Sequence, residues 1–403
     1  MTKKSDTPAI RFKGFTDTWE QRKAKELFVS TADKGYPELP VLSATQDRGM
    51  IRRDENSINI FHDKKNEAGY KRVLPGQFVI HLRSFQGGFA HSTIEGITSP
   101  AYTVFGFSEP EKHDSEYWKY VFTSKSFIRR LETVTYGIRD GRSISYEEFL
   151  TLGFVYPSKA EQKAIARYLD KLSDLITLHQ RKYDKLTNVK KSMLEKMFPK
   201  NGSNVPEIRF KGFTEAWEQR KLGDVVKEIT RNDPESEAPI MMITANNGFI
   251  EQSERYAFNN AGESLKKYIL LKKGELAYNH GASKLRPYGS CFALTTAENA
   301  RIPFVYHCFS AENQNAEFMS IELNGAEIEN QLRKIVSSGA RMDGLLNISF
   351  DEYTSVSVLL PGTEEQDCIA DFFRQLDNLI TLHQRELEKL KNIKKSCLEN
   401  MFV

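Results

Sequence analysis

The stretch "IRFKGFTDTWEQRK", residues 10–23, occurs again as "IRFKGFTEAWEQRK" at residues 208–221, and only two of the fourteen positions differ. An internal repeat of this kind decides the architecture, because each copy opens one structural module. The chain of 403 residues is also too long for one ordinary hydrophobic core. We therefore expect a duplicated protein with two similar halves.

A second repeated block closes each half. "LSDLITLHQRKYDKLTNVKKSMLEKMF" (172–198) and "LDNLITLHQRELEKLKNIKKSCLENMF" (376–402) are identical at 18 of 27 positions. Alternating steps of three and four residues join the apolar positions, which is typical of a heptad seam on a long helix. The seam positions are Ile165, Leu169, Leu172, Ile176, His179, Tyr183, Leu186, Lys190, Met193 and Met197, and they recur 204 residues later as Ile369, Phe373, Leu376, Ile380, His383, Leu387, Leu390, Lys394, Cys397 and Met401. We interpret the polar seam residues as setting the register rather than as ligands or catalysts.

The two helices begin with matching signals, "PSKAEQ" (157–162) and "PGTEEQ" (361–366). Equal length and equal register predict that they pair with each other as an antiparallel coiled coil of about 41 residues, roughly 60 Å long. The alternative is that each helix packs only on its own globular half. On the paired reading, Val403 lies near Ile10, just as Phe198 leads into Ile208.

Between each opening block and its helix lie strand-like segments with turn residues. The apolar framework of these segments is shared by the two halves, whereas the polar residues beside the glycines differ. The fold class we predict is α+β, with two tandem pseudo-symmetric mixed α/β domains and two long helices. The predicted boundaries are 1–157 and 208–361 for the domains, 158–198 and 362–403 for the helices, and 199–207 for the linker.

The composition excludes several classes of protein. The net charge is +3, with about +3 on residues 1–157 and about −3 on residues 199–361, so charge alone does not indicate a nucleic-acid binder. No apolar run reaches the length of a membrane span, and the N-terminus lacks the apolar core of a signal peptide, so we expect a soluble, cytoplasmic protein. The four cysteines show no CxxC spacing, which argues against a metal site or a disulfide framework.

Sequence motifs for catalysis are also missing. The chain contains no GxxxxGK[ST], GxGxxG, HExxH or GxSxG motif and no tetrapeptide of the kind that amino-methyltransferases use to hold a flipped base. The acidic pairs Glu147–Glu148 and Asp351–Glu352 are typical of the first turn of a helix. We therefore expect no enzymatic activity from this chain alone.

Taken as a set, the "IRFxGFTxxWEQRK" blocks, the "PxxxEQ" helix starts and the "LITLHQR" helices resemble the specificity subunit of type I restriction-modification systems over nearly the whole chain. The resemblance implies two target-recognition domains that read a bipartite site in double-stranded DNA. It implies two methyltransferase subunits as partners, which carry S-adenosylmethionine, and two motor-nuclease subunits, which use ATP and Mg. No cofactor is implied on this chain.

Arg and Lys suit guanine in the major groove, Asn and Gln suit adenine, and acidic groups suit cytosine. The candidate base-reading residues lie in the loops that differ between the halves, where each is equally compatible with a solvated turn. They are Thr45, Gln46, Asp47, Arg48, Arg83, Ser84, Gln86, Arg139, Arg142, Asn246, Asn247, Asn279, His280, Lys284, Arg286 and Arg341.

Two identical partner subunits need two equivalent docking surfaces, so we expect them on sequence that both halves share or on the outward helix faces. The candidates are Phe12, Phe15, Trp19, Phe210, Phe213, Trp217, Lys163, Arg167, Arg181 and Lys182. For the aromatic residues, a place in the core at the domain edge is the alternative. Two other functions stay open: a duplicated, non-catalytic protein-binding scaffold, and a DNA enzyme with an unrecognised site.

Overall fold

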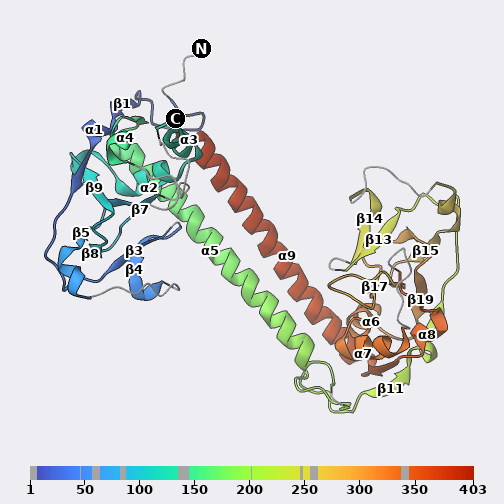
Figure 1. The fold of residues 1–403 in the computed structure, drawn as a ribbon. Coiled ribbons are helices and arrows are strands. Elements are labelled where there is room, and N and C mark those ends of the chain that lie inside the picture. The colour runs from blue at the N-terminus through green and yellow to red at the C-terminus, as the bar shows by residue number, and fades with distance from the viewer. Residues whose placement is uncertain are drawn as a thin grey trace. The chain divides into compact units, whose positions relative to one another are not determined.

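The chain forms two compact units, the first from Met1–Arg181 with Gln384–Val403 and the second from Lys182–His383. Each unit holds a globular half and one end of each long helix, α5 (Lys159–Lys196) and α9 (Thr363–Asn400) (Figure 1). The computed structural model describes residues 7–45, 47–56, 64–81, 88–134, 145–200, 202–245, 248–254, 262–336 and 345–403.

The first unit is built on a four-stranded antiparallel sheet with the order β2-β9-β6-β7. Three antiparallel strand pairs, β1-β10, β3-β4 and β5-β8, surround it. The strands are β1 (Glu20–Lys23), β2 (Phe28–Thr31), β3 (Leu42–Thr45), β4 (Gly49–Arg52), β5 (Lys71–Val73), β6 (Phe78–Ile80), β7 (Phe89–His91), β8 (Gly96–Thr98), β9 (Thr103–Phe107) and β10 (Gly153–Tyr156). The helices are α1 (Ala24–Leu27), α2 (Ser115–Thr123), α3 (Lys125–Val134) and α4 (Tyr146–Leu150).

The second unit repeats this topology strand for strand. Its sheet has the order β12-β19-β16-β17, and its strand pairs are β11-β20, β13-β14 and β15-β18. The strands are β11 (Glu218–Lys221), β12 (Val226–Glu228), β13 (Met241–Thr244), β14 (Gly248–Glu251), β15 (Ile269–Lys272), β16 (Leu276–Asn279), β17 (Ser290–Ala293), β18 (Asn299–Ile302), β19 (His307–Ala311) and β20 (Ser357–Leu360). The helices are α6 (Ala316–Leu323), α7 (Ala326–Ile335) and α8 (Phe350–Thr354). The duplication read from the sequence is therefore a duplication of the fold.

Short 3-10 helices connect several of these elements. They are η1 (Arg53–Glu55), η2 (Lys64–Gly69), η3 (Pro110–Lys112), η4 (Leu222–Asp224), η5 (Gln252–Glu254) and η6 (Gly262–Lys267). The turn η4 stands where the first unit has α1, directly after the opening block.

Aromatic side chains form the core of the first unit. Phe28 contacts Phe105, Trp118 and Phe149 with ring centroids 5.2 to 5.5 Å apart, and all four side chains are almost completely buried. Each buried aromatic ring of this size contributes about 2 to 3 kcal/mol of hydrophobic free energy before the entropy of ordering is subtracted. Phe28 and Phe105 lie on the paired strands β2 and β9, whereas Trp118 and Phe149 come from α2 and α4.

Each opening block is joined to its helix by a buried ion pair. In the first unit the Arg11 guanidinium donates from Nε and Nη2 to the two oxygens of Glu161, both at 2.7 Å. In the second unit Arg209 makes the same two 2.7 Å bonds to Glu365. The side chains of Glu161 and Glu365 are both 1% exposed. A buried carboxylate without a cation is costly, so each glutamate needs its arginine partner. The "IRF" and "PxxxEQ" motifs thus recur because each supplies one partner of this clamp.

The glutamine beside each clamp glutamate connects the helix to the sheet domain. Gln162 donates to the carbonyl of Pro157 and accepts from the backbone N–H of Asp114, the N-cap of α2. Gln366 donates to Pro361 and accepts from the N–H of Asn315, the N-cap of α6. Both glutamine side chains are completely buried.

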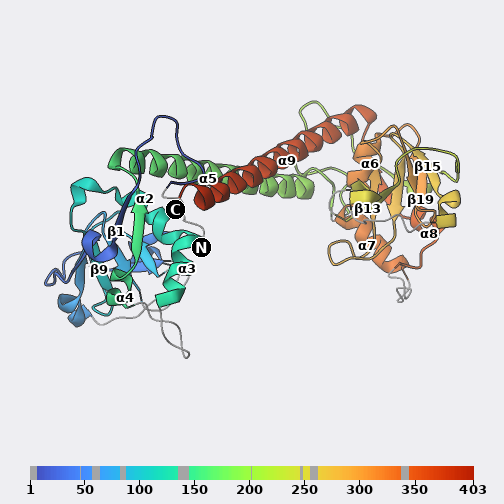
Figure 2. The same ribbon diagram turned by 90° about the horizontal axis from the view of Figure 1, so that it is seen from above.

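The helices α5 and α9 share the hydrophobic cores of both units; they run alongside each other in Figure 1 and cross in the view of Figure 2. In the first unit Leu169 and Leu172 of α5 share a core with Cys397 and Met401 near the C-terminal end of α9. In the second unit Met193, from the other end of α5, packs in the core that holds Phe373, near the start of α9. The pairing is therefore antiparallel, and the predicted fold class, an α+β repeat with an antiparallel helix pair, is confirmed.

Polar seam residues and the chain ends follow the predicted pairing. Lys190 donates to Asp377 in the second unit, and Lys394 donates to Ser173 Oγ at 2.8 Å in the first. The Ile10 N–H donates to the carbonyl of Asn400 at 2.9 Å, and the Ile208 N–H donates to Lys196 at the same distance. The C-terminus thus meets the opening block of the first unit, as the sequence predicted.

Candidate nucleic-acid interface

The β3-β4 and β13-β14 hairpins are closed in the same way. Thr45 Oγ1 donates to the carbonyl of Gly49 at 2.8 Å, and Thr244 Oγ1 donates to Gly248 at 3.3 Å. Both glycines have positive φ, +69° and +64°, a conformation that other residues adopt at a cost. The Arg48 N–H adds a bond to Thr45 Oγ1 at 3.1 Å. The scaffold of the two hairpins is therefore shared.

The residues that these scaffolds present differ between the units. Asp47 and Arg48 at the first tip are exposed, and in the described part of the chain neither forms an ion pair. The second tip carries Asn246 and Asn247 at the corresponding point; they lie outside the described residues, as does Gln46. The side chains of Asp47 and Arg48 are therefore available for contact with a ligand.

The hairpins are fixed to the central sheets. A Cβ on Gly49 would lie 2.3 Å from the carbonyl oxygen of His91 in β7, and a Cβ on Gly248 would lie 3.2 Å from the ring of Phe292 in β17. His91 is buried, and this burial lowers the pKa of its imidazole. The glycine at the end of each hairpin turn is therefore packed against its central sheet.

Two candidates at the end of β16 and the start of the β16-β17 loop are held by the protein itself. Asn279 donates from Nδ2 to Ile243 at 3.1 Å and accepts at Oδ1 from the Gly281 N–H at 2.9 Å. The two ring nitrogens of His280, a residue only 7% exposed, lie 2.8 and 2.7 Å from the carbonyl oxygens of Leu346 and Val305. In this conformation both side chains support the loop rather than face outward.

The remaining candidates in this loop behave differently from each other. Arg286 donates from Nη1 to the carbonyl of Asn324 at 2.8 Å, and burial lowers the pKa of its guanidinium. Lys284 is exposed. Of the four candidates in "YNHGASKLRP", only Lys284 is therefore presented fully to solvent.

Nine candidates lie outside the described residues. They fall in the chain segments after β3, between β6 and β7, between α3 and α4, after β13, and between α7 and α8: Gln46, Arg83, Ser84, Gln86, Arg139, Arg142, Asn246, Asn247 and Arg341.

The aromatic docking candidates divide into core and edge residues. Trp19 and Trp217 are 4% and 2% exposed and belong to the cores of their units, as the alternative reading expected. Phe12 contacts Tyr168 of α5 edge-on at 5.5 Å, and Phe210 contacts Phe372 of α9 at 5.9 Å. Phe15 and Phe213 are half-buried. The opening blocks thus use their aromatic residues mainly to hold the helices.

The outward helix faces carry an apolar feature that the sequence reasoning missed. Lys163, Arg167, Arg181 and Lys182 are exposed. Beside them Leu175 and Leu178 are 42% and 45% exposed, and their counterparts Leu379 and Leu382 are 44% and 52% exposed. Single exposed leucines are ordinary on a protein surface, and here equivalent pairs are exposed on both helices. The sequence could have revealed this feature, because the two leucines of each repeated "LITL" do not occupy seam positions.

Other chemistry finds little support in the described part of the chain. No group of three or more His, Cys, Asp or Glu there is placed to hold a metal ion, and no described helix is long and apolar enough to cross a membrane. Burial raises the pKa of the Cys291 thiol to about 12, so it does not form a thiolate nucleophile near neutral pH.

No protein-family model matches the chain. Among solved structures, the S subunit of a type I restriction-modification system from M. genitalium aligns with a TM-score of 0.52 at 15% identity, over 98% of this chain and 99% of that chain. The HsdS subunit from Thermoanaerobacter tengcongensis aligns at 0.44 and 14%, over 95% and 96% of the two chains. A chain from a structure titled for complex assembly and conformational transition of the type I R-M system aligns at 0.44 and 12%, over 95% and 97%. This chain therefore shares the fold of the M. genitalium S subunit from end to end.

Proposed function

We propose that this chain is the DNA-recognition subunit of a type I restriction-modification complex. Residues 1–157 and 208–361 would act as its target-recognition domains, one for each half of a bipartite site. The observation that carries the proposal is the pair of hairpins, closed identically by Thr45–Gly49 and Thr244–Gly248, whose tips differ in sequence. One scaffold with two different reading surfaces suits a target made of two different half-sites.

Base reading is assigned first to the exposed side chains of the described loops. Arg48 suits guanine, Asp47 suits the amino group of cytosine, and Lys284 suits guanine or a phosphate. The candidates outside the described residues keep their proposed role. Because the net charge is only +3, partner subunits would supply many of the phosphate contacts.

The chain would perform no chemistry itself. Two methyltransferase subunits carrying S-adenosylmethionine would bind it, and motor-nuclease subunits using ATP and Mg would join them, in the cytoplasm beside the host DNA. The leucine pairs at 175/178 and 379/382 fit such partners, because identical surfaces in the two units suit two copies of one protein.

Long-read methylome sequencing of the host with and without this gene tests the proposal. We expect loss of adenine methylation at one split motif with a fixed gap. Arg48→Ala should then relax one position of one half-site, whereas Arg52→Ala in the same hairpin, whose side chain pairs with Asp54, should leave the motif unchanged. An unchanged methylome with the methyltransferase expressed would favour the protein-binding scaffold instead.

A further inference from the structure

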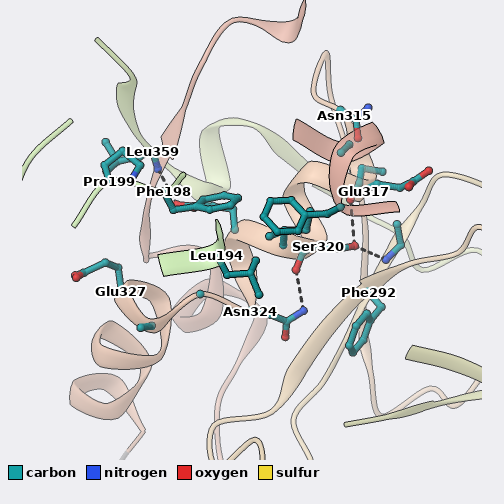
Figure 3. Close-up of a pocket in the computed structure, with 18 of the residues that line it drawn as sticks. Leu194, Phe198, Pro199, Phe292, Asn315, Glu317, Ser320, Asn324, Glu327 and Leu359 are labelled. Atoms are coloured by element: carbon teal, nitrogen blue, oxygen red, sulfur yellow. Dashed lines mark hydrogen bonds between the residues drawn. The ribbon is translucent and has the colours of Figure 1, made fainter. Parts of the chain in front are cut away.

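The second unit contains a solvent-open groove of about 1620 Å³. It lies between the end of α5, residues 198–200 and 202–204, the helices α6 and α7, the strand β20 and residues 370–378 of α9. Figure 3 shows Leu194 and Phe198 in the middle of this lining, together with Ser320, Asn324 and Glu327. The groove has room for several amino-acid residues, since its volume exceeds that of a single side chain many times over.

A buried carboxylate lines the groove. Glu322 of α6 is only 8% exposed, and its Oε1 accepts from the Leu359 N–H of β20 at 3.1 Å. Among the described residues Oε2 has no hydrogen-bond partner. Burial, assisted by the charge of nearby Glu327, raises the pKa of Glu322 to about 7. A buried carboxylate without a cation is costly, so its presence calls for a reason.

The repeat shows that the fold does not need this carboxylate. The N-caps Asp114 and Asn315 are equivalent, because each accepts from the N–H three residues later and donates its own N–H to the clamp glutamine. Counting onward from these caps, Glu322 corresponds to Val121. The same architecture therefore forms with an apolar side chain at this point.

A cation present in the first unit is missing from the second. Lys125 at the start of α3 donates to Glu399 of α9 at 2.9 Å. Counting from the same caps puts Ala326 in the place of Lys125, and the helix repeat puts Glu195 in the place of Glu399. Glu195 lines the groove, where it has no ion-pair partner among the described residues. The acceptor has been kept while its internal donor has been lost.

The charge around this point is more negative in the second unit than in the first. Val121, Lys125 and Ser126 of the first unit become Glu322, Ala326 and Glu327 in the second. Four of the cations that line the groove are already occupied: Lys190, Lys200, Lys273 and Arg374 pair with Asp377, Glu207, Glu298 and Glu317. The fifth lining cation, Arg286, donates to the carbonyl of Asn324. Glu195, Glu322 and Glu327 have no ion-pair partner within the described residues.

We infer that the groove binds a polypeptide segment of a partner protein, which inserts an Arg or Lys side chain beside Glu195, Glu322 and Glu327 and so replaces the cation that Lys125 supplies in the first unit. The carboxylates repel phosphates, which disfavours DNA as the occupant. Because these residues belong to the second unit alone, one such partner binds per chain. The inference does not depend on the proposed DNA recognition.

Fluorescence anisotropy on the purified full chain tests it. The probe is a short fluorescein-labelled peptide of Ser, Leu and Arg, compared with the same peptide containing neutral citrulline for Arg, at a pH one unit above the pKa of Glu322. The Arg peptide should bind about tenfold tighter than the citrulline peptide. The double variant Glu322→Gln with Glu327→Gln should abolish this difference, whereas the matched control Glu235→Gln with Glu254→Gln, which changes two exposed carboxylates, should preserve it.

A second variant separates loss of binding from loss of folding. Ala326→Lys restores the internal cation, so it should pair with Glu195, keep the melting temperature at or above that of the parent, and weaken the Arg peptide about tenfold. Equal affinity for the Arg and citrulline peptides, or full affinity in Ala326→Lys, would overturn the inference. The inference would also be overturned if the peptide did not bind and a short DNA duplex bound more tightly to Ala326→Lys than to the parent chain. The groove would then be a nucleic-acid site.

Discussion

Removing the arginine of one clamp should loosen one unit and leave the other unchanged. In Arg11→Met, the Glu161 carboxylate, 1% exposed, loses both of its 2.7 Å bonds to the guanidinium. Orphaning a buried charge of this kind costs about 3 to 5 kcal/mol. The equivalent clamp between Arg209 and Glu365 is untouched, so the chain contains its own control.

Hydrogen–deuterium exchange read by mass spectrometry measures this loss locally. A cost of about 3 kcal/mol corresponds to roughly 10²-fold faster exchange in the amides of residues 10–23 and in the first turns of α5. The amides of residues 208–221 should exchange as in the parent. Arg209→Met should give the mirror-image result.

The double variant Arg11→Met with Glu161→Leu decides whether the orphaned charge is the cause. Replacing a buried ion pair by apolar residues of similar size is often neutral or stabilising, so exchange should return close to the parental rate. If the double variant exchanges as fast as Arg11→Met, the cost comes from lost packing of the arginine stem. If Arg11→Met itself changes exchange by less than about threefold, the clamp does not hold the block to its helix.

Three further measurements follow from the structure. The raised pKa of Glu322, about 7 against an ordinary 4.5, means that the folded state holds its proton more tightly, so the free energy of unfolding should fall by up to about 3 kcal/mol as the pH rises from about 4.5 past 7. Glu322→Gln should remove this slope in denaturant titrations; an unchanged slope would show that the carboxylate is hydrated. Gly49→Ala should destabilise its hairpin by at least about 2 kcal/mol, because the new Cβ would lie 2.3 Å from a carbonyl oxygen of β7. The control Gly35→Ala, also at positive φ but in open space, should cost only about 1 to 2 kcal/mol. Equal losses of melting temperature in the two variants would refute the steric argument. Leu178→Glu and Leu382→Glu should each remove one methyltransferase copy in native mass spectrometry, and retention of both copies in either variant would place the docking surface elsewhere.

The repeated parts of this molecule could be predicted because each copy serves as a template for the other. Lys196 and Ile208 are close in sequence, because the end of α5 leads directly into the second opening block. The equivalent bond in the first unit, from the Ile10 N–H to the carbonyl of Asn400, could therefore be predicted from the repeat. The seam of α5 and α9 was predicted for the same reason, since a period of three and four residues that recurs in register on two helices is typical of helices that pack on each other. At these positions the apolar pattern of each helix matches the packing of the two helices in the structure.

The candidate site was predicted less completely, because exposure of a loop residue depends on distant backbone. Asn279 and His280 looked like base readers, yet their partners are carbonyls of Ile243, Val305 and Leu346, far away in sequence. Glu322 gave no signal either, since an acidic residue in a helix usually lies on the solvated face. Only the packing of β20 against α6 turns it into a buried group.

The comparison of the two units gives a stronger criterion for function than burial or charge alone. The clamps, the hairpin closures and the seam are the same in both units, so they mark what the fold requires. The exposed leucines are also the same in both, which fits the proposal of two identical partner subunits. The change from Lys125 to Ala326, with Glu195 retained, breaks the symmetry by removing half of an ion pair. Lys125 and Glu399 are 66% and 42% exposed, so losing this ion pair costs the folded chain little, and the retained Glu195 beside two added carboxylates fits the partner cation that we infer.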